Sequence, residues 1–322
     1  MTDRGLKSLR ALKIIPKDKI ANSTNFFSEA QTLKAAEHPN IVRAEETGLF
    51  ADGSIYVAME YLRRGSVADE ASGAALPMTR AKQLMIDTLR GLAHAHGRNI
   101  IHRDIKPANI LIGPANEGKL SDFGLALDLA TPDALAVKDY AYIMHLAPEV
   151  ERAQDCSRLS DIYAAGVTLY RLINGDRSLA SLSISEVRGR TKAGMYPNRS
   201  EYRDYIPRKL KEVVNTALEV APANRFAEAD EMRRALERVT IKVNWDEREL
   251  TDGTRWRGRS SSHRYEVLRK ATALGWAVVV RKAKAGGKLR VVTALSKAAL
   301  AEDAARRWSR GLLQDLSVGK MP

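Results

Sequence analysis

The apolar and polar positions of the chain follow different periods in its opening, middle and final segments. Residues 10–15 form a short apolar run that ends before a proline, which predicts a strand carrying one lysine, Lys13. Apolar residues at helical spacing predict a helix over 26–36, ended by a His-Pro-Asn sequence. Two further strands are predicted at 41–50 and 54–61, on either side of an Asp-Gly turn. The opening segment is therefore expected to be mainly β-structure with one helix.

The middle of the chain has the apolar spacing of helices. From Thr79, which we expect to cap the helix, apolar residues recur on one face as far as His96. His94 and His96 are two residues apart and diverge on a helix, so they are not expected to bind a metal together. We therefore interpret this helix as structural.

The last segment, from about residue 239, changes to the pattern of short strands. Strands are predicted at 240–245, 265–270, 276–282 and 288–295, with a loop rich in glycine and serine after the first. Gly286-Gly287 predicts a hairpin between the last two strands. Ser296 is expected to cap a final helix that packs on the sheet through Leu300, Ala304, Trp308 and Leu312, with Arg306, Arg307 and Arg310 exposed.

The composition adds a domain boundary to this picture. With 44% hydrophobic and 28% charged residues, the 322-residue chain is near the globular average, which excludes a wholly disordered or collagen-like protein. Residues 239–322 contain 18 of the 52 Lys and Arg residues, 8 of the 39 Asp and Glu residues, and all four tryptophans. Most of the net charge of +13 therefore belongs to this segment. We predict one domain at 1–238 and a small basic domain at 239–322.

The cysteine content and the apolar runs predict the compartment. The chain has one cysteine, Cys156, which cannot form an intrachain disulfide, and its first residues lack the apolar core of a signal peptide. No apolar run approaches the about 20 residues that span a bilayer. These features predict a soluble cytoplasmic protein with no membrane partner.

Three short motifs follow one another in the segment 102–149. The first is His-Arg-Asp-Ile-Lys-Pro-Ala-Asn-Ile-Leu at 102–111, and Asp-Phe-Gly stands at 122–124, eighteen residues after Asp104. Ala-Pro-Glu follows at 147–149. Any one of these motifs is a weak signal, but their joint order is the signature set of protein kinases. Over residues 1–238 the chain resembles a bacterial serine/threonine protein kinase of the eukaryotic, or Hanks, type.

This resemblance implies an α+β fold with two lobes. The small N-lobe would be rich in β-structure and occupy 1–62, and the C-lobe would be helical and occupy 63–238. The basic β-meander with one helix at 239–322 would be an added domain. The resemblance also implies a buried ion pair between Glu149 and Arg225, which we interpret as a structural element.

The resemblance assigns catalytic and metal-binding roles to five residues. Asp104 would accept the proton of the substrate hydroxyl, and Lys106 would place a cation beside the γ-phosphate, which favours a Ser/Thr substrate over Tyr. Arg103 would pair with a phosphate on the activation loop. Asn109 and Asp122 would supply hard oxygen ligands for Mg²⁺. Such an arrangement suits phosphoryl transfer, where catalysis consists mostly of positioning and charge neutralisation.

Five further residues are assigned to the nucleotide by the same resemblance. Lys13 would hold the α- and β-phosphates of ATP, with Glu29 on the following helix as its ion-pair partner. Met59 falls at the gatekeeper position, and the backbones of Glu60 and Leu62 would meet the edge of the adenine.

Two departures from the family pattern keep a second function open. A glycine-rich loop should precede Lys13, but the twelve preceding residues contain one glycine. Tyr142 stands where Ser/Thr kinases usually have the threonine that aligns the substrate. The first hypothesis is an ATP-dependent Ser/Thr protein kinase, and the alternative is a pseudokinase without the lid, acting as a scaffold or nucleic-acid-binding regulator. A small-molecule phosphotransferase ranks last, because the chain has both the Ala-Pro-Glu motif and the late arginine.

The basic domain at 239–322 leaves three partners open. Its positive charge could bind nucleic acid through phosphate contacts, with the tryptophans as stacking platforms. It could equally dock on an acidic protein or pack on the kinase domain, and tryptophans in so small a domain are more often part of the core.

Overall fold

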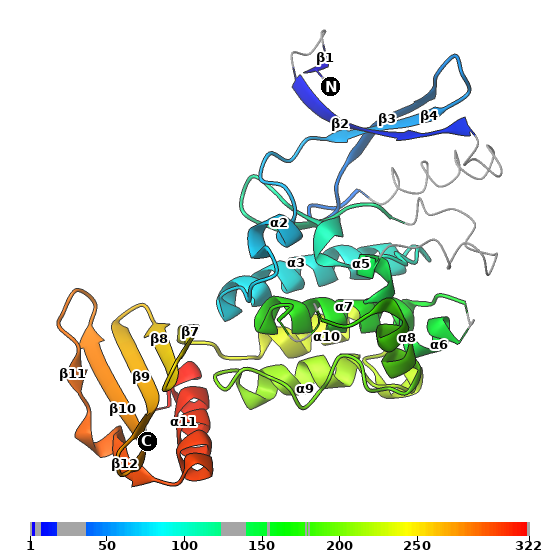
Figure 1. The fold of residues 1–322 in the computed structure, drawn as a ribbon. Coiled ribbons are helices and arrows are strands. Elements are labelled where there is room, and N and C mark those ends of the chain that lie inside the picture. Colours follow the sequence, from blue (N-terminus) through cyan, green and yellow to red (C-terminus); the bar gives the residue numbers. More distant parts are fainter. Residues whose placement is uncertain are drawn as a thin grey trace. The chain divides into compact units, whose positions relative to one another are not determined.

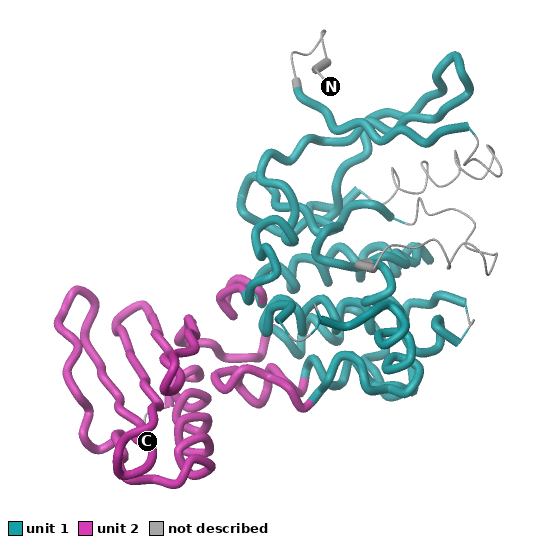
Figure 2. Tube along the Cα trace, viewed as in Figure 1, with its two compact units in different colours: residues 1–75, 82–199, 213–236 teal, residues 76–81, 200–212, 237–322 magenta. Residues whose placement is uncertain are grey.

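The computed structural model describes residues 2–3, 8–17, 37–123, 140–152, 155–177, 179 and 181–320 (Figure 1). The chain forms two compact units, which Figure 2 distinguishes by colour. The first unit consists of residues 1–75, 82–199 and 213–236. The second consists of residues 76–81, 200–212 and 237–322, so it includes two short segments from the middle of the chain. The boundary that we predict at residue 239 stays a prediction.

The first unit begins with a four-stranded antiparallel sheet in the order β1-β2-β4-β3. Its strands are β1 (Thr2–Asp3), β2 (Ser8–Ile15), β3 (Ala44–Leu49) and β4 (Ile55–Glu60). The β3–β4 hairpin turns at Asp52, whose side chain accepts a hydrogen bond from the backbone of Ser54, and at Gly53, which has a φ of +83°. Ile55 and Val57 form the buried centre of this sheet. The helix that we predict at 26–36 lies outside the described residues.

Helices form most of the remainder of the first unit. They are α2 (Val67–Ala71), α3 (Met78–His96), α5 (Tyr140–Ile143), α6 (Pro148–Glu151), α7 (Arg158–Asn174), α8 (Ile184–Lys192), α9 (Arg208–Ala217) and α10 (Ala229–Glu237). The first residues of α3 and α9 and the last residue of α10 are counted with the second unit. Helix α3 begins at Met78, so Thr79 is inside the helix and is not its cap. The carbonyl of Pro77 instead accepts the hydrogen bonds of Arg80 and Ala81.

Helix α7 forms the centre of this helical layer. Its start is fixed by a capping box in which the side chains of Ser157 and Ser160 each accept a backbone N–H of the other residue. From Ser160 onwards its residues are buried, apart from Arg171, which fits the pattern of a helix that is apolar on all sides. The hairpin of β5 (Ile110–Ile112) and β6 (Gly118–Leu120) follows a short 3-10 turn, η2 (Pro107–Asn109).

The second unit contains an antiparallel sheet and one long helix. The main strand order is β11-β10-β9-β8-β7, and β12 also pairs with β10. The elements are β7 (Asn244–Leu250), β8 (Gly253–Arg259), β9 (His263–Thr272), β10 (Gly275–Lys284), β11 (Arg290–Val291), β12 (Lys297–Leu300) and α11 (Glu302–Ser317). Helix α11 packs against β9, β10 and β12.

The strand predicted at 240–245 and the loop predicted after it are wrong, because β7 begins only at Asn244 and the predicted loop contains most of β7 and all of β8. The buried residues Thr254, Trp256 and Gly258 of β8 alternate with more exposed arginines, which is the alternation of a strand. The alternation is hard to recognise in the sequence because one of the buried positions is a glycine. The glycine is required by packing, since a Cβ at Gly258 would lie 2.6 Å from the ring of Trp245.

The expected end of the meander is also wrong in detail. Only Arg290–Val291 of the predicted strand 288–295 pairs with β10, and a 3-10 turn, η4 (Thr293–Leu295), follows. Ser296 does not cap a helix, because its Oγ donates to the carbonyl of Val292 and accepts from the backbone of Val280. Leu300 consequently lies in β12, and α11 begins at Glu302.

None of the helices in the described part of the chain combines the length and the apolarity that a membrane crossing requires.

Candidate active site

A buried carboxylate fixes the backbone of the segment that contains the first motif. Asp161, near the start of α7, accepts hydrogen bonds of 2.8 Å from the backbone N–H groups of His102 and Arg103 and lies 2.8 Å from Nε2 of His96. Arg103 has a φ of +68°, a conformation that non-glycine residues rarely adopt. The contacts of Asp161 therefore hold a strained turn immediately before Asp104.

His102 joins this turn to the segment 121–123. Its Nε2 lies 3.0 Å from the carbonyl oxygen of Ser121, and its Nδ1 accepts the backbone N–H of Asp104 at 3.3 Å. Its ring packs on the ring of Phe123, with the centroids 4.6 Å apart. Burial lowers the pKa of His102. The neutral ring, with its proton on Nε2, satisfies both contacts, whereas a second proton on Nδ1 would face the N–H of Asp104.

The two carboxylate oxygens of Asp104 have different surroundings. Its Oδ2 accepts hydrogen bonds from Nδ2 of Asn109 at 2.8 Å and from Nζ of Lys106 at 3.0 Å. Nδ2 of Asn109 also donates to the backbone carbonyl of Asp104 at 2.8 Å. Oδ1 is buried and has no hydrogen-bond partner among the residues that the structure describes. Asp104 is thus oriented through one oxygen while the other stays available.

Lys13 and Asp122 meet although 109 positions separate them in the sequence. Nζ of Lys13 lies 2.6 Å from Oδ1 of Asp122, and the two side chains are 34% and 40% exposed. Strand β2 positions Lys13 by pairing it with Val57 on β4. Asp122 has a φ of +56° and so turns the chain directly after Ser121. Glu29, the partner that we predict for Lys13, lies outside the described residues.

Asn109 and Asp122 are brought together by the β5–β6 hairpin. The backbone N–H and the Oγ of Ser121 both donate to the carbonyl oxygen of Asn109, at 2.9 and 3.1 Å. The contacts of the Asn109 side chain with Asp104 are made by its Nδ2. Its amide oxygen has no hydrogen bond to any described residue. One hard oxygen of Asn109 is therefore without a partner among the described residues, and the hairpin brings Asn109 next to Ser121, the residue before Asp122.

The predicted adenine-binding residues lie where the chain leaves the first sheet. Met59 and Glu60 are the last residues of β4, and Leu62 follows two residues later. The Glu60 carboxylate forms an ion pair with Lys119 and accepts the backbone N–H of Arg43. The carbonyl of Leu62 accepts the N–H of Gly65, whose φ is +68°. These contacts fix the connection between the sheet and the helical part.

Sequence reasoning missed three residues that shape this region. No role in the site was predicted for Asp161, His102 or Lys119. The available signals in the sequence were the position of His102 at the start of the first motif and a single lysine, Lys119, between Gly118 and Leu120. Neither signal names a partner, because Lys119 and Glu60 are far apart in the sequence.

Tyr142 is a buried member of α5, with 4% of its surface exposed. Burial raises the pKa of its hydroxyl, and the neighbouring charges of Cys156 and Asp104 raise it further. Tyr142 is therefore close enough to Asp104 for the two groups to interact electrostatically. It stands at the position where the family pattern has the threonine that aligns the substrate. Its burial removes it as a surface phosphorylation site in this structure.

The ion pair implied for Glu149 and Arg225 is present. Two hydrogen bonds of 2.7 Å join the guanidinium to the carboxylate, and the Arg225 side chain is fully buried. The guanidinium also donates to the carbonyl of Leu159 and lies over the ring of Tyr163, 4.9 Å from its centroid. The pair joins the end of the third motif to the start of α7.

Residues 2–237 match the family model described as protein kinase domain. The chain belongs to the protein kinase family. It is 32% identical to the serine/threonine-protein kinase PknB of Mycobacterium leprae over 242 residues, which are 71% of this chain and 38% of PknB. It is 30% identical to PrkC of Bacillus subtilis over 254 residues, which are 75% of this chain and 37% of PrkC. The chain thus spans less than two fifths of the length of these relatives.

A solved structure shows the same fold. The crystal structure of Rad53 1-466 in complex with AMP-PNP matches with a TM-score of 0.58 and 24% identity, over 71% of this chain and 58% of that one. The protein kinase fold predicted for residues 1–238 is confirmed by this likeness. The C-terminal antiparallel meander with one helix, also predicted, is present in the second unit.

Proposed function

We propose that this kinase-family chain is an ATP-dependent serine/threonine protein kinase that transfers the γ-phosphoryl group of ATP to a protein hydroxyl. The arrangement of Asp104 supports this proposal most strongly. Asn109 and Lys106 orient one of its oxygens, and the other is buried without a partner among the described residues. An oriented oxygen that is not engaged is suited to accept the proton of a substrate hydroxyl.

The cations near Asp104 complete the proposed transfer site. Lys106, 3.0 Å from Asp104, would stabilise the negative charge of the transferred group, and its presence favours Ser or Thr as the acceptor. Arg103 has an exposed side chain beside this base. We assign it to a phosphate on the activation loop, which it would hold by charge-assisted hydrogen bonds.

Asn109 and Asp122 fit the Mg²⁺ that such a reaction needs. The amide oxygen of Asn109 has no hydrogen bond to a described residue, and the Asp122 carboxylate is 40% exposed. In the described ranges, no group of three or more His, Cys, Asp or Glu side chains could hold a metal, which agrees with a Mg²⁺ that shares one or two protein ligands with substrate phosphates. When bound there, the ion would neutralise charge on the β- and γ-phosphates.

Lys13 is the proposed ligand of the α- and β-phosphates of ATP. In the structure it is paired with Asp122, so nucleotide binding would exchange that partner for phosphate. Glu29 is proposed as its second partner. Met59, Glu60 and Leu62 are proposed to line the adenine site, since they lie in the segment that joins the sheet to the helices. The likeness to a structure holding the adenine nucleotide AMP-PNP supports this assignment.

Residues 239–322 are proposed to recognise a partner or substrate. This segment is strongly basic and has its own sheet, helix and core. A compact domain with this charge is suited to bind nucleic acid or an acidic protein.

The transfer reaction can be tested with the chain as it stands. The protein is incubated with radiolabelled ATP, Mg²⁺ and a general protein substrate, beside Asp104→Asn and the control Asp52→Asn, whose side chain lies in the β3–β4 turn. Loss of the base should reduce transfer about 10²- to 10⁴-fold, while the control should retain it. Equal labelling by wild type and Asp104→Asn would contradict the role of Asp104. Phosphoamino-acid analysis then separates Ser/Thr from Tyr.

The alternative is a pseudokinase that binds nucleotide and regulates a partner without transfer. The buried Tyr142, in the position expected to align the substrate, is the observation that favours it. This alternative predicts no labelling by wild type, together with a rise in melting temperature on addition of ATP. Tyr142→Thr would then be the variant to examine for a gain of transfer.

A further inference from the structure

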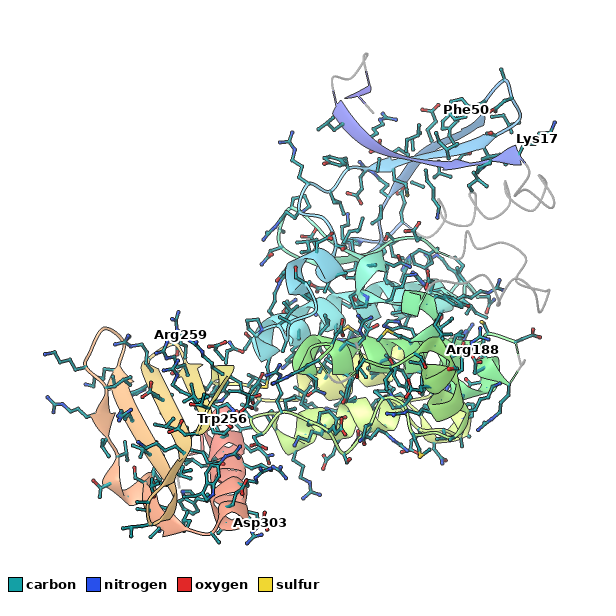
Figure 3. All side chains as sticks on the ribbon, in the orientation of Figure 1. Lys17, Phe50, Arg188, Trp256, Arg259 and Asp303 are labelled. Atoms are coloured by element: carbon teal, nitrogen blue, oxygen red, sulfur yellow. The ribbon has the colours of Figure 1, made fainter. Side chains whose placement is uncertain are left out.

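The sheet of the second unit has one face that is covered by α11. Trp245, Trp256 and Val267 on this face are at most 7% exposed, and they share it with buried valines of β10. Nε1 of Trp245 donates to Oγ of Ser317 on α11, and Figure 3 shows Trp256 where the sheet approaches that helix. These tryptophans form the core of the domain, so they cannot act as stacking platforms for bases.

The opposite face of β7–β10 carries a dense group of cations, which we call the basic face. Residues that are paired across an antiparallel sheet, and every second residue along a strand, share one face. By this rule the basic face contains seven cations, Arg248, Arg255, Arg257, Arg259, Arg264, Lys270 and Arg281. The same face contains two acidic residues, Asp246 and Glu266. Arg259, labelled in Figure 3, lies at the end of β8.

Most of these cations are not compensated within the protein. Glu266 pairs with Arg281 and, at 3.8 Å, with Arg257. Among the described residues, none of the other five cations has an acidic partner within ion-pair distance. Two pairs of arginines even stand directly opposite each other, Arg248 with Arg255 and Arg259 with Arg264, an arrangement that is unfavourable for a sheet.

Arg255 has an additional open hydrogen-bonding site. Its Nε is buried and has no hydrogen-bond partner among the described residues. Buried N–H groups are normally satisfied, so an anion that binds between Arg248 and Arg255 would remove both the repulsion and the open donor.

Arginines of α11 differ from most cations of the basic face, because two of them form ion pairs with acidic residues. Arg306 pairs with Glu302 at 2.6 Å, and Nε of Arg310 pairs with Asp204 at 2.8 Å. Their charge is therefore partly compensated within the second unit, although the sequence suggests an exposed basic helix. Arg307 is the one arginine of α11 without an ion pair among the described residues, so most of the uncompensated charge belongs to the basic face of the sheet.

The geometry of the basic face points to a phosphate backbone as its ligand. Arg255, Arg257 and Arg259 follow one another on β8 at spacings of about 6.8 Å. On the neighbouring strands, about 4.8 Å away, Arg248 lies beside Arg255 and Arg264 beside Arg259, whereas Asp246 and Glu266 flank Arg257. No aromatic residue occurs on this face of β7–β10, so it offers no aromatic platform for the stacking of bases. Phosphate contacts alone suit a duplex, whose bases are already stacked and whose two strands present a high charge density.

We propose that the basic face binds the phosphate backbone of double-stranded nucleic acid without sequence preference. This inference rests on the proposed recognition role of residues 239–322 and is independent of phosphoryl transfer.

The test uses the full chain and a fluorescein-labelled 24-base-pair DNA of arbitrary sequence, with anisotropy measured from 50 to 200 mM salt. The variant Arg248→Gln/Arg259→Gln/Arg264→Gln changes three exposed residues of the basic face. The matched control Arg306→Gln/Arg307→Gln/Lys320→Gln removes the same charge from exposed positions elsewhere in the domain. We expect the first variant to raise Kd at least tenfold and to reduce the slope of log K against log salt by about 3. The control should change Kd less than threefold.

Three further probes decide between ligands. Single-stranded DNA of the same length and a second duplex of different sequence compare strandedness and sequence, and polyglutamate represents an acidic protein. Equal binding of both duplexes, with weaker binding of the other two, supports the proposal. Tighter binding of polyglutamate than of the duplexes would overturn the proposed ligand, although residues 239–322 would still be a recognition domain. An equal loss of duplex affinity in both triple variants would overturn the assignment of binding to the basic face. Loss of phosphoryl transfer in the Asp104→Asn variant should leave duplex binding unchanged.

Discussion

The carboxylate of Asp161 accepts the backbone N–H of Arg103, a residue held at a φ of +68°. The same carboxylate accepts the N–H of His102 and contacts His96, so one buried charge determines the path of the chain into Asp104. A left-handed arginine is costly by itself and persists because three contacts converge on one side chain.

We therefore expect Asp161→Asn to damage both stability and transfer. The amide can accept fewer hydrogen bonds than the carboxylate, and each charged hydrogen bond that is lost costs about 1.5–3 kcal/mol. Urea unfolding should shift to a lower midpoint by an amount equivalent to about 2–4 kcal/mol. The exposed Asp303→Asn serves as the control, and an unchanged midpoint for Asp161→Asn would contradict the assigned role.

Acidification should weaken the fold through His102. Burial holds its pKa below the usual 6.5, so the unfolded chain binds more protons than the folded one near and below pH 6.5. The contribution of neutral His102 to the free energy of unfolding is therefore fully present above that pH. It falls as the pH decreases, by up to about 1.4 kcal/mol per pH unit for the uptake of one proton. In denaturant titrations between pH 5.5 and 7.5, His102→Gln should show a smaller slope than wild type. His263→Gln, in β9, should retain the wild-type slope.

Lys13→Ala should impair nucleotide binding. The lysine reaches the site from β2 and already sits beside Asp122, where phosphate would be held by its charge. We expect at least a tenfold rise in the Kd for ATP with Mg²⁺, measured by calorimetry. Lys17→Ala, just beyond the end of the same strand and labelled in Figure 3, should bind ATP like wild type. Equal affinity of all three proteins would exclude Lys13 from the nucleotide site.

The Glu149–Arg225 pair should show strong coupling. Removal of one partner leaves a buried charge without compensation, which costs about 3–5 kcal/mol. Glu149→Gln and Arg225→Met should each destabilise the first unit by about this amount. The double variant should lose clearly less than the sum of the two, as a double-mutant cycle monitored by circular dichroism would reveal. Additive losses would mean that the two side chains act independently.

The packing of Gly258 gives a test confined to the second unit. A methyl group there would meet the ring of Trp245, so Gly258→Ala should destabilise the sheet by about 1–3 kcal/mol. Gly311→Ala is the matched control, because a Cβ at this helical position meets nothing within 4 Å and should stabilise α11 by up to about 1 kcal/mol. All four tryptophans lie in residues 239–322, so tryptophan fluorescence reports the unfolding of this domain. A wild-type transition for Gly258→Ala would contradict the described packing.

The contacts within the proposed transfer site could be predicted from the sequence mainly where its residues are close together in the chain. Asp104, Lys106 and Asn109 lie within one short loop, and their mutual contacts follow from local geometry once the motif is read. Lys13 could be assigned to the nucleotide, but its contact with Asp122 depends on how a strand and a distant turn are placed in space. The pairing of Glu60 with Lys119 could not be predicted for the same reason.

The second unit shows the same limit at the level of a whole domain. The sequence by itself determined that residues 239–322 are basic, rich in tryptophan and formed of short strands with a final helix, because charge and periodicity are properties of neighbouring residues. Only the tertiary structure decided that Trp245 and Trp256 are core, that β8 is a strand, and that most of the uncompensated arginines lie on the sheet, because Arg306 and Arg310 of α11 find acidic partners. The physical reason is that strand register and helix packing determine which face is buried and which charges find partners, and both depend on contacts between distant residues.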